Sequence, residues 1–413
     1  MAAPSAIAEL MRDLGDALNN NPNLLFLGGG NPALIPEAGE IFQQHLQTLL
    51  ADKALTQRWL GIYQSPQGSE TLLSALSGYL QDQGWPVTSK NLVVINGGQT
   101  AFNRLFNLFG GPSSSGTQRI HLPMVPEYVG YRGQMIGGDA FAVSRPLIEL
   151  ESEHRFRYQL DRNALKLDEL SGAVCLSRPT NPSANVMTLD DVSWLEAQAK
   201  RWNIPLMVDC AYGAPFPNVM QPSQAYRWSA GSVAVLSLSK LGLPGLRTAV
   251  VVADEALVTL LARVGAVESL ASGNTGPLLL ESLISSGDIH RLTQLVPAFY
   301  EPKRKLMLEL LDSHLAGLDY RIHNPDGAFF VWLWLPNLPI NAKALYQRLK
   351  ARNVLVMAGN DFFFGEEESW QHGRECIRLN ICQSDEAMAE AVAIIASEVK
   401  TTFSQKKIAV ADI

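Results

Sequence analysis

Six short, continuously apolar runs separated by helical segments constrain the fold of this chain more than any other feature. The runs cover residues 92–95, 119–122, 173–176, 204–208, 233–238 and 248–252. Runs of this kind are typical of strands that are buried on both faces of a mostly parallel sheet. Helical stretches such as residues 189–202 lie between some of them. The alternation predicts an α/β fold whose sheet is covered by helices on both sides.

The pattern changes towards the C-terminus, where long helical segments surround a few strands. Residues 278–315 read as largely helical, although we expect Pro297 and Pro302 to kink or interrupt the helix. Residues 328–335 and 376–381 read as strands of a second, smaller sheet, and apolar positions in the first 20 residues have helical spacing. We therefore predict a large domain over residues 51–300. A small α+β domain is expected to form from both chain ends, residues 1–50 plus 301–413.

Composition excludes several classes of function. A net charge of −7 without a Lys/Arg stripe argues against nucleic-acid binding. The longest apolar runs are far shorter than the roughly 20 residues that span a bilayer, and the N-terminus does not resemble a signal peptide. The four cysteines have no Cys-x-x-Cys spacing and the histidines form no ligand pair, so no metal site is expected. We expect a cytoplasmic protein with reduced, buried cysteines.

Polar side chains follow three of the apolar runs, at the point where each predicted strand ends. The segments are Asn96-Gly97-Gly98-Gln99, Asp209-Cys210-Ala211-Tyr212 and Ser239-Lys240-Leu241-Gly242-Leu243-Pro244-Gly245-Leu246-Arg247. Ligands of open α/β sheets bind outside the carboxyl ends of the strands. A lysine at a buried strand end is costly unless the site uses it.

The segment around Lys240 suits a phosphorylated aldehyde cofactor. A lysine forms an imine only through its neutral amine, so its pKa has to fall well below about 10.4. Arg247 and an apolar wall would both lower this pKa. Hydroxyl groups, such as those of Ser237 and Ser239, and the guanidinium could bind a phosphate. Gly97, Gly98 and Gln99 precede an apolar helical pattern, so backbone amides at a helix N-terminus offer a second phosphate anchor.

In their order and spacing, these residues resemble those of the fold-type I pyridoxal-phosphate (PLP) dependent aminotransferases along nearly the whole chain. The resemblance implies that Lys240 carries PLP as a Schiff base and acts as the general base and acid. It places Ser237 and Arg247 on the phosphate. Asp209 then pairs with the pyridine nitrogen. Asn181, in Arg178-Pro179-Thr180-Asn181-Pro182, and Tyr212 then contact the phenolic oxygen.

The same resemblance assigns the remaining contacts. Tyr128, in Pro126-Glu127-Tyr128-Val129-Gly130-Tyr131, matches the aromatic residue that stacks on the cofactor ring. Arg378 matches the arginine that binds the substrate α-carboxylate, with Gly30 and Asn181 beside it. Tyr63 matches the tyrosine that reaches the phosphate of the neighbouring subunit. The resemblance therefore implies a homodimer with shared active sites and with an amino acid and a 2-oxo acid as substrates.

Within the family, three strings look most like those of valine–pyruvate aminotransferases. They are residues 27–33, 107–109 and 125–131. Cys210 directly after Asp209, and Ser74 where many relatives carry arginine, depart from the family pattern. No Lys or Arg lies between Arg263 and Arg291, which favours a neutral aliphatic substrate such as valine or alanine over a dicarboxylate. The expected reaction is L-valine + pyruvate = 3-methyl-2-oxobutanoate + L-alanine.

Three alternatives stay open at this point. A PLP-dependent lyase of β-carbon–sulfur bonds shares every cofactor residue, and an aromatic or kynurenine-type aminotransferase differs only in the shape of its pocket. A PLP-sensing transcription regulator would carry a DNA-binding domain before the aminotransferase-like part. This chain begins its aminotransferase-like arm almost at once, which disfavours the regulator.

Overall fold

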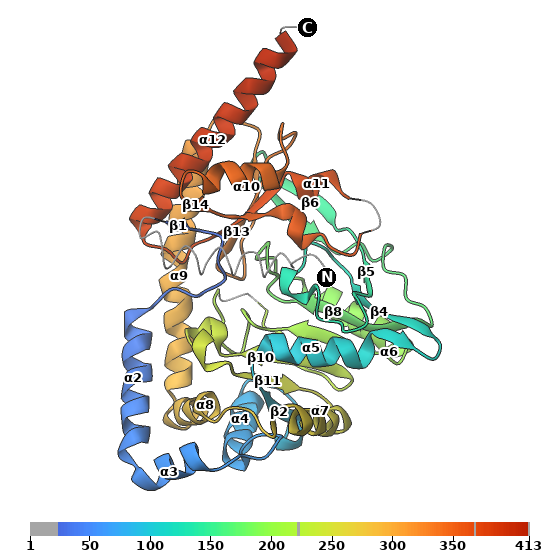
Figure 1. Ribbon diagram of the computed structural model, residues 1–413, viewed down its shortest axis with the longest axis vertical. Helices are drawn as coiled ribbons and strands as arrows, with labels where there is room; N and C mark the ends of the chain where they lie inside the picture. The colour runs from blue at the N-terminus through green and yellow to red at the C-terminus, as the bar shows by residue number, and fades with distance from the viewer. Residues whose placement is uncertain (1–23, 221–223, 367–368, 412–413) are drawn as a thin grey trace.

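An eight-stranded sheet forms the centre of the molecule (Figure 1). The structure is a computed structural model and describes residues 24–220, 224–366 and 369–411; the helix predicted within the first 20 residues lies outside them. The strand order is β2-β11-β10-β9-β8-β4-β3, with β5 beside β4. Their bounds are β2 Leu92–Ile95, β3 Gly111–Ser113, β4 Gly116–Leu122, β5 Phe141–Val143, β8 Ser171–Ser177, β9 Leu206–Asp209, β10 Ser232–Ser237 and β11 Ala249–Val252.

The strands of this sheet run mostly in one direction, as predicted. β4, β5, β8, β9 and β10 form parallel pairs. β11 is antiparallel to both β10 and β2, so β2 has the same direction as the parallel strands. Every residue of β2, β8, β9, β10 and β11 is buried, which explains why these strands read as continuous apolar runs. The carboxyl ends of β2, β8, β9 and β10 therefore meet at one edge of the sheet.

Helices pack against this sheet and begin where the sequence provides caps. α5 (Gly98–Phe109) follows β2 and starts directly after Gly97, which has a φ of +93°. α6 (Leu189–Arg201) is capped by the Thr188 hydroxyl, which accepts from the amide of Asp191. α5 packs on β2, β4, β10 and β11, whereas α6 packs on β8 and β9. The remaining helices of this part are α3 Lys53–Gly61, α4 Glu70–Asp82, α7 Glu255–Ser269 and α8 Thr275–Ser286.

A second sheet of six strands has the order β15-β16-β13-β12-β7-β6. Two of them, β13 and β16, are the strands predicted near the C-terminus. The bounds are β6 Leu147–Ser152, β7 Arg155–Gln159, β12 Arg321–His323, β13 Phe330–Trp334, β15 Met357–Ala358 and β16 Cys376–Asn380. The hairpin of β6 and β7 comes from the middle of the chain and joins the C-terminal strands through the parallel pair of β7 and β12.

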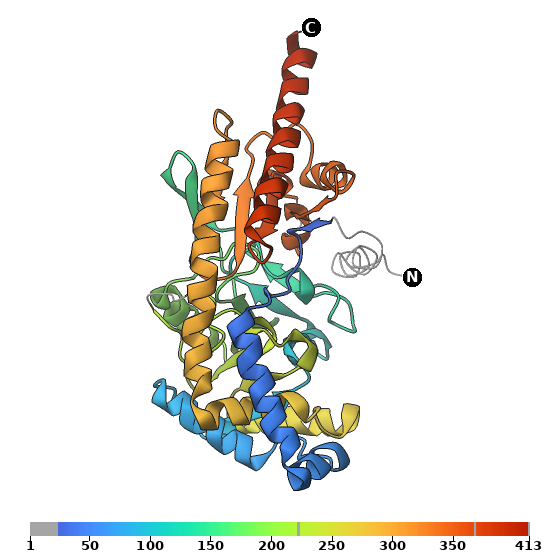
Figure 2. The ribbon, with the colours of Figure 1, turned by 90° about the vertical axis from the view of Figure 1, so that its left-hand side faces the viewer.

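The prediction that Pro297 and Pro302 interrupt a helix is wrong. Both lie inside α9 (Asp288–His314), and the helical segment is instead broken at Gly287, whose φ is +84°. An interior proline removes one hydrogen bond and costs about 3 kcal/mol. α9 offsets this cost by packing against α2 (Pro36–Ala51), α8 and α12 (Asp385–Ala411), and it buries seven side chains. Figure 2 shows α9 as one long helix beside α2 and α12.

The two ends of the described chain lie against each other. β1 (Leu25–Phe26) pairs in parallel with β14 (Val354–Leu355), and α12 packs on β1 and β14. α10 (Ala342–Lys350) and α11 (Gln371–Arg374) complete this region. None of the helices in the described part of the chain is long and apolar enough to cross a membrane.

Candidate active site

A cavity of about 260 Å³ lies where the carboxyl ends of the parallel strands meet. Its walls come from the start of α5, the loop after β4, the ends of β8, β9 and β10 with the segments that follow them, the loop after β1, and β15 and β16. All the predicted site residues except Gly97 and Tyr63 line it, namely Gly30, Gly98, Gln99, Tyr128, Asn181, Asp209, Tyr212, Ser237, Ser239, Lys240, Arg247 and Arg378. The fold thus brings together residues that are up to 348 positions apart in the sequence (378 − 30).

Lys240 lies in a short 3-10 turn, Ser239–Leu241, directly after β10. Its Nζ donates a hydrogen bond to the carbonyl of Gly30 at 2.7 Å and lies 5.5 Å from the centre of the Tyr212 ring. Burial lowers the pKa of Lys240 from 10.5 to about 8, and the nearby cations Arg378 and Arg247 also lower it. An amine with this pKa is far more available as the neutral nucleophile than an ordinary lysine.

Asp209 ends β9 and is buried. Its Oδ2 accepts from the Tyr131 hydroxyl at 3.0 Å, and its Oδ1 accepts from the amide of Ala211 at 2.9 Å. Burial raises the pKa of Asp209 to about 6, while the two hydrogen bonds and Lys240 oppose this rise. The carboxylate is therefore the main form at neutral pH, and it could hold a protonated ring nitrogen.

Arg378 is a buried cation on β16 and is only 2% exposed. Its Nη1 donates to Asn181 Oδ1 at 2.7 Å, and its guanidinium lies 4.2 Å from the centre of the Phe330 ring. Within the described residues, its Nε is buried without a hydrogen-bond partner. Burial lowers the pKa of Arg378 to about 10, so it stays protonated at neutral pH. A buried guanidinium on a residue that lines the cavity is a suitable partner for a carboxylate.

The other end of the cavity offers donors for a phosphate. Gly98 begins α5, and the space where its side chain would be is open to 4 Å. Ser237, Ser239 and Arg247 also line the cavity. Gly97 does not line the cavity, but a Cβ there would lie 2.4 Å from Arg247 Nη2, so glycine is what lets Arg247 take this position. Helix amides, hydroxyls and a guanidinium together fit the phosphate of PLP.

Tyr63 is the one predicted contact that this chain does not bring near the cavity. It follows α3, and its side chain is 75% exposed. It borders a separate surface hollow formed by residues 60–63 and 271–274. Its predicted role in a neighbouring subunit stays a prediction.

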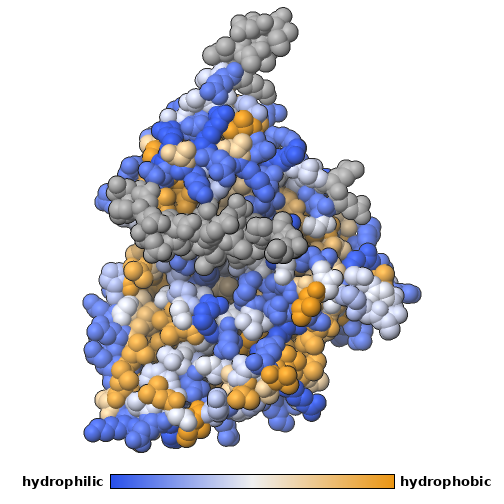
Figure 3. Space-filling view, in the orientation of Figure 1, coloured by the Kyte–Doolittle hydropathy of each residue, from blue (hydrophilic) through white to orange (hydrophobic). Residues whose placement is uncertain are grey.

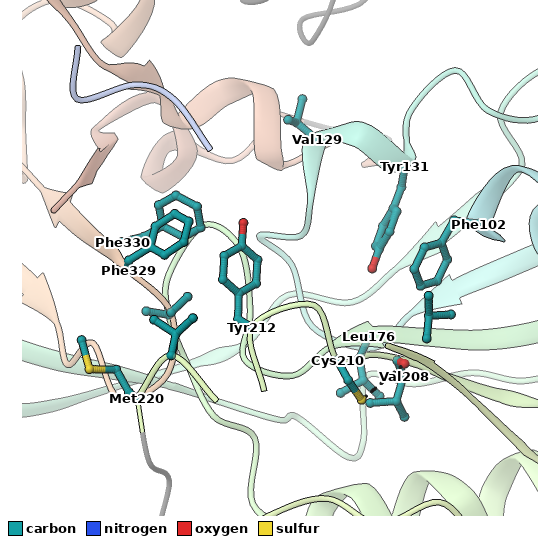
Figure 4. Packing of buried hydrophobic residues seen from close by; sticks show 14 of the residues in the cluster. Phe102, Val129, Tyr131, Leu176, Val208, Cys210, Tyr212, Met220, Phe329 and Phe330 are labelled. Carbon is teal, nitrogen blue, oxygen red and sulfur yellow. Dashed lines mark hydrogen bonds between the residues drawn. The ribbon is translucent and has the colours of Figure 1, made fainter. Parts of the chain in front are cut away.

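Sequence reasoning missed several residues of the site. Tyr131 holds Asp209, and its ring lies 4.9 Å from Phe102, another cavity residue (Figure 4). Glu127 is buried beside Ser177, whose side chain also lines the cavity. Tyr131 and Glu127 both lie in the Pro126–Tyr131 string, close to the predicted site residue Tyr128. This closeness in sequence was the signal that could have identified them. Figure 4 also shows Tyr212 beside Phe329 and Phe330, which fix its ring from the side of the second sheet.

Comparison with known proteins identifies the class. Residues 22–395 match the family Aminotransferase class I and II, and the chain belongs to this family. The chain is 39% identical over 404 residues to the valine–pyruvate aminotransferase of Escherichia coli (strain K12), covering 97% of this chain and 96% of that protein. The crystal structure of the valine–pyruvate aminotransferase from Salmonella typhimurium LT2 has a TM-score of 0.88 at 37% identity, covering 97% of this chain and all of that one.

A third similar protein, from Psychrobacter arcticum 273-4, has a known crystal structure and is described as an amino-acid aminotransferase. It has a TM-score of 0.94 at 36% identity and covers 97% of both chains. The protein is therefore an aminotransferase, and the predicted fold-type I architecture is confirmed.

Proposed function

We propose that the protein is a PLP-dependent aminotransferase with the reaction L-valine + pyruvate = 3-methyl-2-oxobutanoate + L-alanine. The observation that carries the substrate class is the distribution of charge in the cavity. Among the described residues that line it, the cations are Lys240, Arg247 and Arg378. If Lys240 binds the cofactor and Arg247 its phosphate, Arg378 remains for a single α-carboxylate. This arrangement favours a monocarboxylate, and the two valine–pyruvate aminotransferases are similar over almost the full chain.

Apolar residues of the cavity suit an aliphatic side chain. Phe26, Phe102, Val129 and Met357 line it together with the polar groups. No second cation is left among the described lining residues to compensate a side-chain carboxylate. Burying such a carboxylate unpaired would cost several kcal/mol. We therefore expect valine and alanine to be accepted and aspartate to be a poor donor.

The residues of the cavity fit PLP. Lys240 would hold it through its amine, Asp209 its ring nitrogen, and Asn181 and Tyr212 its phenolic oxygen. Gly97, Gly98, Gln99, Ser237, Ser239 and Arg247 would form the phosphate end, with Tyr128 against the ring. When bound, PLP supplies an electron sink for the negative charge that develops at the substrate Cα.

Two side chains of this chain then bind the substrate and transfer its proton. Arg378 binds the α-carboxylate next to Gly30 and Asn181, which orients the Cα–H bond. Lys240, with its lowered pKa, removes the Cα proton and delivers it again as general base and acid. The same groups serve both half-reactions, because the amino group that one substrate loses is the group that the other gains.

We also propose a cytoplasmic homodimer in which Tyr63 completes the partner's site. Leu60 in α3 and Ile62 directly after it are exposed and line the same hollow as Tyr63. Val267 and Leu270, at the end of α7, are exposed as well. Figure 3 shows apolar residues gathered in the lower half of the molecule, where Figure 1 places α3 and α7. A second copy would cover this surface. The four free cysteines are compatible with a reducing compartment. The division into a large domain (51–300) and a small domain (1–50 plus 301–413) remains a proposal.

A half-reaction screen tests the proposed function. Purified protein with PLP is expected to show a visible absorption band, which L-valine and L-alanine convert to the spectrum of the aminated cofactor. Lys240→Ala should lose both the visible band and turnover. A wild-type enzyme that reacts faster with L-aspartate than with L-valine would contradict the proposed substrate class. Sedimentation of the active species tests the dimer, and a fully active monomer would refute it.

A further inference from the structure

Glu127 is a buried carboxyl group that the proposed chemistry does not use. It lies in the loop after β4, directly before Tyr128, and it is 2% exposed. Its Oε1 accepts from the Ser177 amide at 2.8 Å. Its Oε2 accepts from the Ser177 hydroxyl at 2.6 Å and from the Tyr128 amide at 3.0 Å. Each of these described partners is an uncharged donor. Burying an acid without a cation is costly, which calls for a reason.

The contacts of Glu127 continue into the site through hydrogen bonds. The Ser177 hydroxyl that donates to Glu127 also accepts from the Asn181 amide at 3.3 Å. The Asn181 side chain in turn accepts from Arg378. Three hydrogen bonds therefore connect Glu127 with the guanidinium that would bind the substrate carboxylate.

A second route from Glu127 reaches the same arginine. The backbone amide of Glu127 donates to the carbonyl of Phe362 at 3.1 Å. The ring of Phe362 lies 5.3 Å from the guanidinium carbon of Arg378. The two routes form a closed circuit through both sheets, because Ser177 ends β8 and Arg378 lies on β16.

We infer that Glu127 is a positioning residue that holds Tyr128, Asn181 and Arg378 in register around the bound amino acid. The inference rests on the proposed function, since it assigns Glu127 to the orientation of that substrate and of the aromatic residue that faces the cofactor ring. Burial raises the pKa of Glu127 to about 8, although its hydrogen bonds from Ser177 and Tyr128 oppose this rise. The two carboxyl oxygens together accept all three hydrogen bonds, which joins Ser177 and Tyr128 through one side chain.

Glu375 provides a matched control elsewhere in the chain. It is 6% exposed and also accepts three hydrogen bonds, from Trp334 Nε1 at 2.9 Å, the Asn337 amide at 3.0 Å and Gln371 Nε2 at 3.0 Å. None of these three partners lines the cavity. Glu375→Gln therefore makes the same chemical change in a comparable environment without touching the site.

The test compares Glu127→Gln with Glu375→Gln and the wild type. Glutamine keeps the shape but replaces one acceptor oxygen by a donor, so at least one of the three bonds to Glu127 is lost. We expect the saturating rate of the L-valine half-reaction to fall by about 10-fold to 100-fold, because small misplacements of substrate cost this much. The circular dichroism of the visible band should change as well. Glu375→Gln should lower the melting temperature while leaving rate and visible dichroism unchanged.

Ser177→Ala and the double variant keep the inference testable if Glu127→Gln folds poorly. Ser177→Ala removes the hydroxyl between Glu127 and Asn181, and we expect it to weaken binding of 3-methylbutanoate, a carboxylate without an amino group, about tenfold. The losses of 3-methylbutanoate affinity in Glu127→Gln and Ser177→Ala, expressed as free energies, should add up to clearly more than the loss in the double variant. This is expected because both substitutions break the same hydrogen-bond network. Additive effects, or a Glu127→Gln enzyme with wild-type rate and dichroism, would overturn the inference. A wild-type enzyme without visible band or turnover would instead refute the proposed function itself.

Discussion

Replacing Lys240 with methionine is expected to stabilise the cofactor-free protein at neutral pH. Burial lowers the pKa of Lys240 from 10.5 to about 8. The pKa of Lys240 is therefore about 2.5 units higher in the unfolded chain than in the folded one, so the unfolded chain binds this proton more tightly. At about 1.36 kcal/mol per unit, the protonated amine lowers the free energy of unfolding by up to about 3 kcal/mol. Methionine fills a similar space without a charge and removes this cost.

The sign of the pH dependence follows from the two pKa values. Below pH 8 the amine is protonated in both states, and the full cost is present. Between pH 8 and 10.5 the folded protein has released the proton while the unfolded chain still holds it, so the cost of Lys240 disappears. The advantage of Lys240→Met over the wild type should thus be about 3 kcal/mol at pH 7 and close to zero above pH 10.5.

Urea denaturation of the cofactor-free protein, followed by tryptophan fluorescence, measures this difference. Both proteins are compared at one protein concentration, because the stability of the proposed dimer would depend on it. Titration of groups that do not interact with Lys240 cancels in the difference between the variants. A difference in unfolding free energy that stays constant from pH 7 to 10.5 would refute the reasoning, since it would come from packing and not from the charge of Lys240.

Two further substitutions test single contacts of the site. Arg378→Lys keeps the charge but loses the fork of two N–H donors, so the KM for L-valine should rise by about 10-fold to 100-fold. Isobutylamine, which lacks the carboxylate, should react equally well with the variant and the wild type. An equal loss for both amines would contradict the assigned role of Arg378. Tyr131→Phe removes a hydrogen bond that lowers the pKa of Asp209, at about 6 in the wild type. The acidic limb of the rate profile should therefore move to higher pH, with about a tenfold loss at pH 6 and little loss at pH 8; an unshifted profile would argue against this contact.

Local sequence patterns predicted the large sheet closely because its strands are buried on both faces. β2 was predicted at its observed bounds, and α6 within one residue of its end. The same local reasoning failed at Pro297, because the propensity of proline to break a helix was outweighed by the packing of α9 against three other helices. Only the tertiary structure decides that balance.

The site could be predicted where a residue type stands at or soon after a strand end within a recognisable string, as Asp209, Lys240 and Asn181 do. Glu127 and Tyr131 also stand in such a string, Pro126–Tyr131, but the string does not indicate which residues they contact. They reach Ser177 and Asp209, which are 50 and 78 residues further along the chain, because β4, β8 and β9 are neighbours in the sheet. Contacts of this range depend on the strand order, which no short string encodes.

The cavity holds charged groups that the fold compensates only in part. Burial shifts the pKa of Lys240, Asp209 and Arg378 towards the neutral form in each case. A protonated ring nitrogen beside Asp209 and a carboxylate beside Arg378 would each supply an opposite charge. Ligands that bind only the folded state raise its stability. The cost of burying Asp209 and Arg378 and the affinity for cofactor and substrate therefore have the same origin, namely charged groups whose proposed ligands carry the opposite charge.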